Sequence, residues 1–318
     1  MKNISVIIPA YNEGRNLSKS VLSFINQTVK PLEIIIVDDC SSDNTLNIAY
    51  ELKYKYSKFN IKILKHNKNK GAGGARNTGL LEARGDIIVF AEADGEYSKL
   101  YLQKVLNILE RNRNCFTGGG LRVCSNRNKT IWIEYWNSLF EARWILSKKL
   151  NIHKGGWVFY KQDIKNIGGY NESLKEGEDI ELTNRLLKKG FKSIWIGNVF
   201  FKHREPETII EVFKRFFKAG KNTYKFRKLQ KRYYKDVILS ILFVVFSPIL
   251  MIFPHFFIIF KSETRIAQIR LIKKYKKKQN NILSVILFPY QFYFQKMSTA
   301  LGIIVSFFYE VTKKNKGL

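Results

Sequence analysis

Short apolar runs alternate with amphipathic segments through the first 90 residues of the chain. The runs are rich in β-branched residues, which is typical of strands buried on both faces of a parallel sheet. They cover residues 5–8, 34–37, 61–64 and 87–90. Helical patterns stand between them, at about residues 16–26, 44–56 and 75–83. This alternation predicts an α/β domain with a mainly parallel, doubly wound sheet.

The pattern continues to about residue 205 with a helix, a glycine-rich strand, a long aromatic helix, an acid-capped helix and a last strand. We predict these elements at residues 101–111, 117–121, 130–150, 176–189 and 193–201. In the long helix, aromatic side chains recur at helical spacing at Trp132, Tyr135, Trp136, Phe140 and Trp144. Such a stripe is most often part of a core. The alternative is a face that meets an acceptor or the membrane interface, where tryptophan is favoured.

Beyond residue 205, apolar runs alternate with clusters of Lys and Arg. Residues 207–224 have a basic amphipathic pattern, and helices of this kind often lie in an anionic membrane surface. Its apolar face would consist of Ile209, Ile210, Phe213, Phe216, Phe217 and Tyr224. Residues 237–260 contain no Asp, Glu, Lys or Arg and would form a helix of about 36 Å, which is long enough to span a bilayer. The alternative is a buried core helix. Residues 282–309 are a second apolar stretch, interrupted by Pro289, Gln291, Gln295 and Lys296.

Both flanks of the 237–260 run are basic. Short basic segments prefer the cytosolic side of a membrane, so both flanks are expected on the same side. Pro248 and Pro254 favour a bend in the run, because each removes a backbone hydrogen bond. We therefore predict a re-entrant hairpin in preference to two full spans with residues 282–309 as the return.

These patterns predict three regions: a catalytic domain over 1–205, a basic amphipathic helical linker over 206–235 and a hydrophobic membrane-associated region over 236–318. The net charge of the 318-residue chain is +29, which fits nucleic acid, anionic lipid or phosphorylated substrates. Nucleic acid is disfavoured because the cations bracket apolar runs instead of forming an aromatic-interleaved groove.

The three cysteines show no metal-ligand spacing, which favours a reducing compartment without excluding one disulfide. The start has no apolar region of a signal peptide, so we expect the catalytic half in the cytosol.

Candidate chemistry gathers where the predicted strands end. The strand over 87–90 leads into Glu92, Asp94 and Glu96, whose hard oxygen atoms suit Mg²⁺ or Mn²⁺ held together with substrate phosphates. The alternative is a solvated acidic turn, but in so basic a chain a cluster of acids is expected to hold a cation. Because ligands of open α/β sheets bind at the carboxyl ends of the strands, several groups should meet at one edge. They are Tyr11, Glu13, Asp39, Arg76 and Asp94.

Two further segments carry candidate residues. The glycine-rich turn over 71–77 opens a helix, where backbone N–H groups and Arg76 would face an anion, although it matches no standard phosphate-loop pattern. Glu178 and Asp179 stand at the start of another helix, where acids also complement the helix dipole. If both are partly buried, each raises the pKa of the other, which suits a general base. A lone histidine such as His203 is more often structural than functional.

Five segments together resemble glycosyltransferase family 2, whose members have a GT-A fold and use nucleotide-sugar donors. They are SVIIPAYNE at 5–13, IIIVDDCSSDNT at 34–45, GAGGARNTGL at 71–80, FAEAD at 90–94 and GGYNESLKEGEDIELTNRL at 168–186. The resemblance implies nucleotide-sugar contacts for one set of residues. These are Pro9, Ala10, Tyr11, Glu13, Asp39, Gly74, Arg76 and Glu92.

The resemblance also implies Asp94 as the metal ligand and Asp179, with Glu178, as the base that deprotonates the acceptor. Glu92 departs from the aspartate expected at the first position of the metal motif, while Glu96 and His203 are additional metal candidates. The family inverts anomeric configuration by single displacement. We therefore expect an inverting enzyme, dependent on Mg²⁺ or Mn²⁺, that acts on the cytosolic side of a membrane.

The hydrophobic tail points to a lipid-linked acceptor, such as a polyprenyl or dolichyl phosphate or a lipid-linked glycan. The nearest alternative is an enzyme that elongates a polysaccharide. A non-catalytic glycan-binding or nucleic-acid-binding membrane protein is a different class, and Asp39, Asp94 and Asp179 argue against it.

Overall fold

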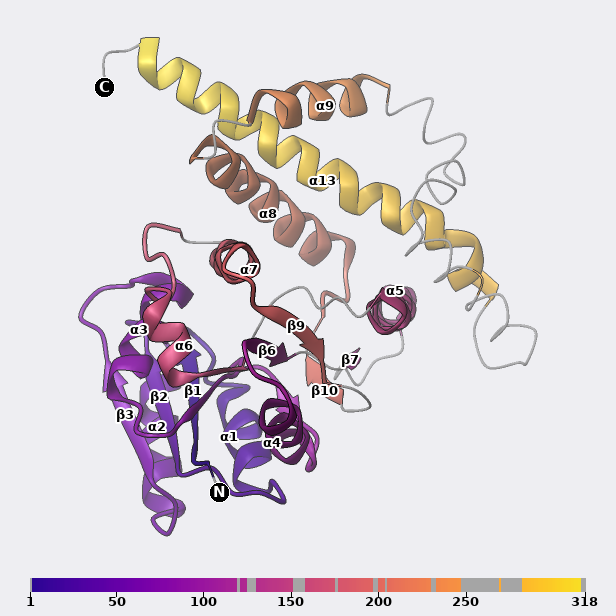
Figure 1. Cartoon of the computed structure of the whole chain (residues 1–318). Helices are drawn as coiled ribbons and strands as arrows, with labels where there is room; N and C mark the ends of the chain where they lie inside the picture. Colours follow the sequence, from indigo (N-terminus) through magenta and orange to yellow (C-terminus); the bar gives the residue numbers. More distant parts are fainter. Residues whose placement is uncertain are drawn as a thin grey trace. The chain divides into compact units, whose positions relative to one another are not determined.

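The structure is a computed structural model that describes residues 2–118, 121–124, 130–150, 158–174, 177–196, 200–203, 205–229, 233–246, 269 and 282–315. The chain divides into two compact units (Figure 1). Unit 1 comprises Met1–Val123 and Trp144–Arg204, and unit 2 comprises Cys124–Arg143 and Glu205–Leu318.

Unit 1 is built on a mixed, mainly parallel sheet. Among the described residues, seven strands form it in the order β3-β2-β1-β4-β8-β6-β9. Their bounds are β1 Ile4–Ala10, β2 Glu33–Asp38, β3 Ile61–Lys65, β4 Ile87–Phe90, β6 Cys115–Gly118, β8 Val158–Tyr160 and β9 Lys192–Trp195. Strand β8 runs antiparallel to β4 and β6, and the other neighbours are parallel. A smaller sheet has the order β5-β10-β7, with β5 Glu96–Tyr97, β7 Leu121–Cys124 and β10 Phe200–His203.

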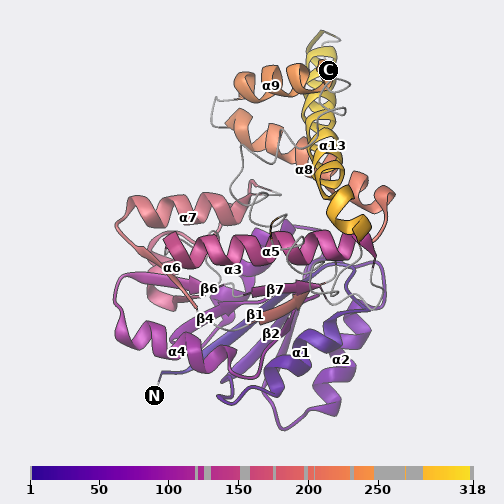
Figure 2. The same ribbon diagram turned by 90° about the vertical axis from the view of Figure 1, so that its right-hand side faces the viewer.

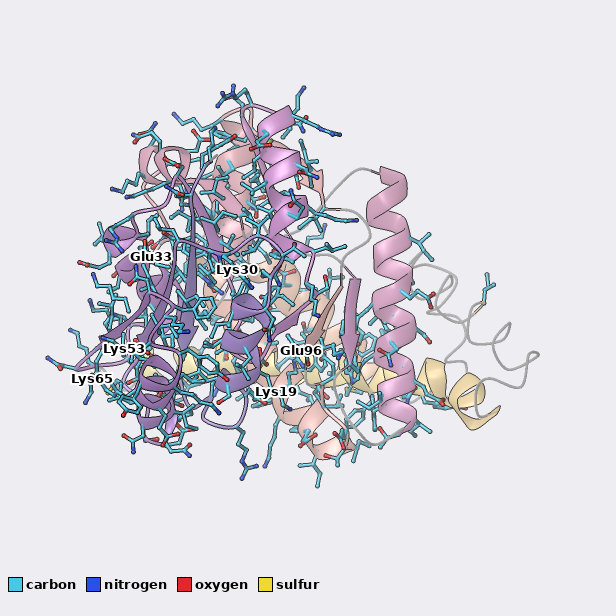
Figure 3. The ribbon with its side chains drawn as sticks, turned by 90° about the horizontal axis from the view of Figure 1, so that it is seen from below. Lys19, Lys30, Glu33, Lys53, Lys65 and Glu96 are labelled. Carbon is cyan, nitrogen blue, oxygen red and sulfur yellow. The ribbon has the colours of Figure 1, made fainter. Side chains whose placement is uncertain are left out.

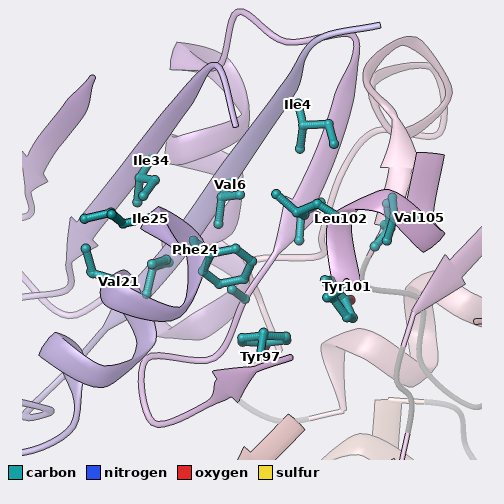
Figure 4. Packing of buried hydrophobic residues seen from close by; sticks show 14 of the residues in the cluster. Ile4, Val6, Val21, Phe24, Ile25, Ile34, Tyr97, Tyr101, Leu102 and Val105 are labelled. Carbon is teal, nitrogen blue, oxygen red and sulfur yellow. The ribbon is translucent and has the colours of Figure 1, made fainter. Parts of the chain in front are cut away.

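Helices cover both faces of the main sheet and so bury the apolar side chains of its central strands. One cluster packs α1 (Leu17–Ile25), α2 (Thr45–Lys55) and α4 (Tyr101–Arg111) against alternate residues of the strands. Figure 4 shows Phe24 of α1 and Leu102 of α4 beside Val6 of β1. The second cluster packs α3 (Gly71–Glu82), α6 (Lys161–Asn166) and α7 (Glu178–Lys188) against the other face. The predicted α/β architecture is confirmed.

The register of the central strands sets the position of the site. Parallel pairing aligns Ala10 with Asp38 and Asp38 with Lys65, so β1, β2 and β3 end side by side. Strand β4 pairs with β1 on its other side and also runs parallel. The loops that leave these strands therefore start from one edge, as the sequence pattern predicted.

Three predicted boundaries are wrong. Helix α3 begins at Gly71 and not at residue 75, because the Asp39 carboxylate accepts the backbone N–H groups of Lys70 and Gly71 and so stabilises a first turn rich in glycine. The predicted strand over 193–201 is two strands, β9 and β10, in different sheets. The predicted strand over 117–121 spans the end of β6 and the start of β7.

The surface of unit 1 carries part of the basic excess. Lys19, Lys53 and Lys65 are exposed and come from three different elements or their ends (Figure 3). Glu33 is buried instead, and its carboxylate accepts hydrogen bonds from the Ser5 hydroxyl and the Arg84 backbone N–H, both at 2.6 Å. These three lysines are therefore solvated and spread over the surface of unit 1.

Unit 2 contains the first part of α5 (Ile131–Leu150) together with α8 (Ile209–Leu229), α9 (Tyr233–Val245) and α13 (Ile282–Asn315). In both Figure 1 and Figure 2, α9 lies beside α13. The aromatic stripe of α5 is core, as its spacing favoured: Trp132, Tyr135, Trp136 and Phe140 are buried. Tyr135 donates a hydrogen bond to Gln295 of α13 at 2.6 Å, and Trp136 stacks on Phe216 of α8. The side chain of Trp144 lies outside the description.

The predicted amphipathic helix is α8, but most of its apolar face does not point to solvent. Phe216 packs on the aromatic stripe, and Tyr224 is buried beside Val237 and Ile303. These side chains find partners within unit 2, and the predicted contact of this helix with a membrane surface stays a prediction. Ile209 and Ile210 are exposed.

No helix in the described part of the chain is both long and apolar enough to cross a bilayer. The uncharged run over 237–260 is described only as far as residue 246, so its two prolines and the basic segment after it, apart from residue 269, lie outside the described residues. The second apolar stretch forms one continuous helix, α13, which passes through Pro289 without ending. The predicted hairpin stays a prediction.

Helices α8 and α13 approach so closely that each presents a glycine to the other. A Cβ atom on Gly302 would lie 2.1 Å from the carbonyl oxygen of Phe217, and one on Gly220 would lie 2.0 Å from that of Thr299. We expect Gly302→Ala to lower the free energy of unfolding by about 1–3 kcal/mol, because a backbone atom cannot rotate away and the helices must separate. Urea unfolding measures this, with Val305→Ala at an exposed site of the same helix as the control. Equal midpoints for both variants would show that the crossing tolerates a methyl group.

Candidate active site

The loops after β1 and β2 are joined by a network of hydrogen bonds. Asn12 has a left-handed backbone (φ 56°), and its side-chain oxygen accepts the backbone N–H of Ser42 at 2.8 Å. Its own backbone N–H donates to the Ser41 hydroxyl at 3.0 Å. This network leaves the predicted nucleotide contact Tyr11 half exposed at the sheet edge (51%). The carboxylate of Glu13 accepts a hydrogen bond from Asn16 at 2.9 Å. Pro9 and Ala10 are the last residues of β1 itself.

Asp39 follows β2 and is buried, with 3% exposure. Its carboxylate accepts the backbone N–H groups of Lys70 and Gly71, both at 2.8 Å. It also contacts the imidazole of His66, with 2.7 Å between Oδ1 and Nδ1. The predicted base-contacting residue is therefore fixed in orientation at the N-terminus of α3.

Arg76 and Glu178 form a buried ion pair. Arg76 Nη1 donates to Glu178 Oε1 at 2.7 Å, and the guanidinium lies 5.1 Å from the centre of the Tyr170 ring. Burial acts to lower the pKa of Arg76, but the phenol of Tyr170 and the carboxylate of Glu178 act in the other direction and the net pKa is raised. Arg76 is a permanent cation here. Gly74, one turn into α3, lies where a Cβ atom would meet the Lys70 side chain at 2.6 Å.

Glu178 and Asp179 are neighbours with different surroundings. Gly177, with a φ of 80°, precedes α7, so both acids stand in its first turn. Burial, followed by the charge of Glu178, raises the pKa of Asp179 above its usual range. Glu178 is the partner of Arg76, whereas the carboxylate of Asp179 accepts the backbone N–H of Ile180 at 2.8 Å. The arrangement leaves Asp179 as the better proton acceptor of the two.

The acidic turn after β4 is held by its backbone. The Glu92 backbone N–H donates to the Tyr97 hydroxyl at 2.9 Å, and its carbonyl accepts the Ser20 hydroxyl at 2.9 Å. Burial, followed by the negative charges of Glu92 and Asp94 among others, raises the pKa of Tyr97 well above its usual value. Both carboxylates therefore lie near this buried phenol, and both are partly exposed.

The remaining metal candidates are placed by β5 and β10. These strands pair antiparallel with Glu96 opposite Lys202, and the two side chains form an ion pair at 3.1 Å. The ammonium group of Lys202 therefore already contacts the carboxylate of Glu96, and a metal ion would compete with it there. The backbone of His203 follows directly in β10, and its side chain lies outside the description.

Among the residues that the structure describes, no three His, Cys, Asp or Glu side chains form a metal cluster. Mg²⁺ and similar ions at phosphate sites often take only one or two carboxylates, with substrate oxygens and water as the other ligands. Asp94 and Glu92 supply hard, partly exposed oxygen atoms of this kind. The donor set fits a divalent ion completed by a phosphorylated substrate.

Three residues at the site were missed by the sequence analysis: His66, Asn77 and Tyr170. The Asn77 amide accepts the backbone N–H of Tyr170 at 2.8 Å and donates to its carbonyl at 2.9 Å. A Cβ atom on Gly169, whose φ is 64°, would lie 2.6 Å from the Asn77 oxygen, so this contact requires glycine. The paired glycines before Tyr170 were the signal for this close approach.

A parallel sheet whose carboxyl edge gathers a buried aspartate, a buried arginine and an acidic turn defines a GT-A-like α/β protein. The chain belongs to glycosyl transferase family 2, whose model matches residues 5–168, and it is a glycosyltransferase. The relatives include the glycosyltransferase AglE of Haloferax volcanii, 27% identical over 69% of this chain and 72% of its own length.

One further relative has a name that describes its chemistry, and one solved structure of similar fold contains bound molecules. The Escherichia coli protein WfgD, a UDP-Glc:alpha-D-GlcNAc-diphosphoundecaprenol beta-1,3-glucosyltransferase, is 34% identical over 39% of this chain and 48% of its own length. The solved mannosyltransferase PcManGT from Pyrobaculum calidifontis, in complex with GDP-Man and Mn²⁺, aligns with a TM-score of 0.56. It is 15% identical and the alignment covers 97% of this chain and 88% of that one, so the likeness shows the fold.

Proposed function

We propose that this protein is an inverting, metal-dependent glycosyltransferase that moves a sugar from a nucleotide-sugar to a lipid-linked acceptor at the cytosolic face of a membrane. The observation that carries the proposal is the buried ion pair of Arg76 and Glu178 beside Asp179. The pKa of the Asp179 carboxyl group is raised. This constellation places a fixed cation and a proton acceptor together at the ligand edge of the sheet.

The donor would lie along the ends of β1, β2 and α3. Tyr11 and Glu13 would contact the nucleotide, and Asp39 would accept a hydrogen bond from the base. Arg76 and the backbone near Gly74 would meet the diphosphate at the N-terminal part of α3, where N–H groups favour an anion. PcManGT holds GDP-Man and Mn²⁺, which supports a nucleotide-sugar and a divalent ion here.

Asp94, with Glu92, would hold Mg²⁺ or Mn²⁺ against the diphosphate, and the ion would neutralise negative charge on the leaving group. Asp179 would take the proton of the acceptor hydroxyl on the opposite side of the anomeric carbon. Glu178 would act indirectly, since it fixes the guanidinium of Arg76.

The metal assignment has a specific test. We expect Asp94→Ala to remove the Mn²⁺-dependent part of nucleotide-sugar affinity, a loss of about 10- to 100-fold. Titration calorimetry with and without Mn²⁺ measures it. Glu96→Gln is the matched control, because Glu96 is already paired with Lys202, and it should change the affinity little. If the two variants behave alike, Asp94 does not hold the ion.

The lipid-linked acceptor is supported by two observations. WfgD acts on a diphosphoundecaprenol-linked sugar by its name. In unit 2, helix α9 buries Val237 and Ser240 but exposes large apolar side chains on another face: Tyr234, Ile238, Leu239, Leu242 and Val245. An exposed apolar helix face of this kind, next to the exposed Lys235, fits the surface of an anionic bilayer.

The membrane proposal predicts a loss of lipid binding in a charged variant of α9. Ile238 and Leu242 are 57% and 45% exposed, so Ile238→Glu/Leu242→Glu should fold normally but bind anionic vesicles at least about 10-fold more weakly. Flotation with phosphatidylglycerol vesicles measures binding, and Leu81→Glu, at a 74% exposed site in unit 1, is the control. Unchanged flotation, or a dimer in light scattering that the double substitution dissociates, would show that the face does not bind lipid.

A further inference from the structure

His66 lies at the end of β3, where the parallel register places it beside Asp39. Lys65 pairs with Asp38, and the next residue, His66, donates its backbone N–H to the Asp38 carbonyl at 2.9 Å. The imidazole is 6% exposed, and its Nδ1 lies 2.7 Å from Asp39 Oδ1. Water is therefore largely excluded from the contact between the ring and the carboxylate.

The second ring nitrogen contacts helix α3. Nε2 of His66 lies 2.9 Å from the Thr78 hydroxyl, and that hydroxyl lies 3.0 Å from the carbonyl oxygen of Gly74. One buried ring thus connects the end of β2 to the part of α3 that contains Gly74 and Arg76.

The donors and acceptors of the ring determine how this connection works. An ionised carboxylate only accepts hydrogen bonds, so Nδ1 of His66 carries a hydrogen toward Asp39. In the neutral ring, Nε2 accepts the Thr78 hydroxyl hydrogen. In the charged ring, Nε2 donates to Thr78, whose hydrogen then points to the Gly74 carbonyl. Every buried polar atom keeps a partner in both states, so the ring keeps its place.

We propose that His66 is a positioning residue for donor binding, which holds the Asp39 carboxylate toward the nucleotide and connects it to the diphosphate turn of α3. The inference rests on the proposed function, which assigns the nucleotide to Asp39 and the diphosphate to the backbone near Gly74. The carboxylate already receives two backbone N–H groups from Lys70 and Gly71. His66 adds a side-chain contact to Oδ1 of Asp39. This contact fixes the direction in which the remaining lone pairs of the carboxylate point.

Three substitutions separate positioning from general stability. His66→Phe keeps a ring of similar size and removes both hydrogen bonds. His66→Asn places an amide nitrogen near the position of Nδ1 and can still donate to Asp39. Thr78→Val removes only the hydroxyl and interrupts the connection to Gly74.

The experiment is titration calorimetry of the full chain with UDP, GDP, ADP, CDP and dTDP, each with Mn²⁺. For the nucleotide that the wild type binds, we expect His66→Phe to raise Kd by about 10-fold or more and His66→Asn to stay within about 3-fold, because a hydrogen bond to a charged group is restored. Thr78→Val should give an intermediate rise. In turnover assays, His66→Phe should raise KM for the donor more than it lowers kcat.

If His66 had a purely structural role, His66→Phe would lower the melting temperature and leave the Kd for the nucleotide unchanged. Equal Kd values for the wild type and folded His66→Phe would therefore overturn the inference. If His66→Phe does not fold, an unchanged Kd in Thr78→Val together with a 10-fold rise in His66→Asn overturns it instead. If the wild type binds none of the five nucleotides, the proposed function fails and the inference fails with it. This result differs from the two above, in which the wild type binds a nucleotide and only the role of His66 is overturned.

Discussion

Asp179→Asn should reduce sugar transfer by about 10²- to 10⁴-fold at saturating donor, because it keeps the shape of the side chain and removes its capacity to accept a proton. Donor affinity should change little, since the diphosphate is assigned to Arg76 and α3. Release of nucleoside diphosphate in the presence of acceptor measures the loss. Near-normal turnover would exclude Asp179 as the base.

The control for this substitution is Glu181→Gln in the same helix. Glu181 pairs with Arg185 four residues later, at 2.6 Å, and faces a different partner from Asp179. We expect its kcat to stay close to that of the wild type. A large loss in both variants would instead indicate a disturbed α7.

The raised pKa of Asp179 adds two expectations with definite signs. A base must be deprotonated, so kcat/KM should rise with pH through a pKa that lies above the usual aspartate range. The folded protein holds this proton more tightly than the unfolded chain, so the contribution to stability is present at low pH and is lost as pH rises through the folded pKa. At neutral pH, Asp179→Asn should therefore unfold at the same temperature as the wild type or higher. A lower melting temperature would contradict the burial of this carboxylate as described.

Arg76→Met should destabilise the protein by about 3–5 kcal/mol, the largest effect on stability that we expect. The side chains of Arg76 and Glu178 are only 7% and 11% exposed, so removal of the guanidinium leaves a buried carboxylate without its partner. Urea unfolding at neutral pH measures the change. A loss below about 1 kcal/mol would mean that Glu178 finds water or another donor.

The double variant Arg76→Met/Glu178→Leu tests the cause. With both charges removed, the penalty for an uncompensated ion disappears, and stability should recover toward that of the wild type. Nucleotide binding should not recover, because the proposed diphosphate contact is absent. Recovery of binding together with stability would show that Arg76 has only a structural role.

The sequence predicted the sheet and its ligand edge because these depend on local signals. Short β-branched strands followed by polar turns determine where β1, β2 and β4 end, and parallel pairing then brings the ends together. The start of α3 was placed four residues too late, since glycines are poor helix formers and the capping carboxylate, Asp39, comes from 32 positions earlier in the chain.

The different partners of Glu178 and Asp179 could not be predicted from their adjacency. The partner of Glu178 is Arg76, 102 positions away in the sequence, and only the fold brings the two together. The same limit applies to His66, whose two partners are Asp39, directly after β2, and Thr78 in α3. Side-chain pairs of this kind depend on tertiary packing, which local patterns do not encode.

The aromatic stripe of α5 shows the opposite case. Its helical spacing favoured a core position, and Trp136 is buried against Phe216 of α8. The amphipathic pattern of α8 does not decide between two roles, because a helix with a wide apolar face can cover either a membrane or a neighbouring helix. Tyr224 packs against Ile303 within unit 2, whereas Ile209 and Ile210 at the start of α8 are exposed.

The anomeric configuration of the transferred sugar tests the central claim most directly. In the proposed mechanism one base, Asp179, acts on the side opposite the leaving diphosphate, which predicts a single displacement. The product formed from an α-linked nucleotide-sugar and a diphosphopolyprenol-linked sugar in vesicles can be isolated, and the coupling of its anomeric proton measured by NMR. We predict a β-linkage, the inverse of the donor. An α-linkage would contradict the assignment of Asp179 as the acceptor base.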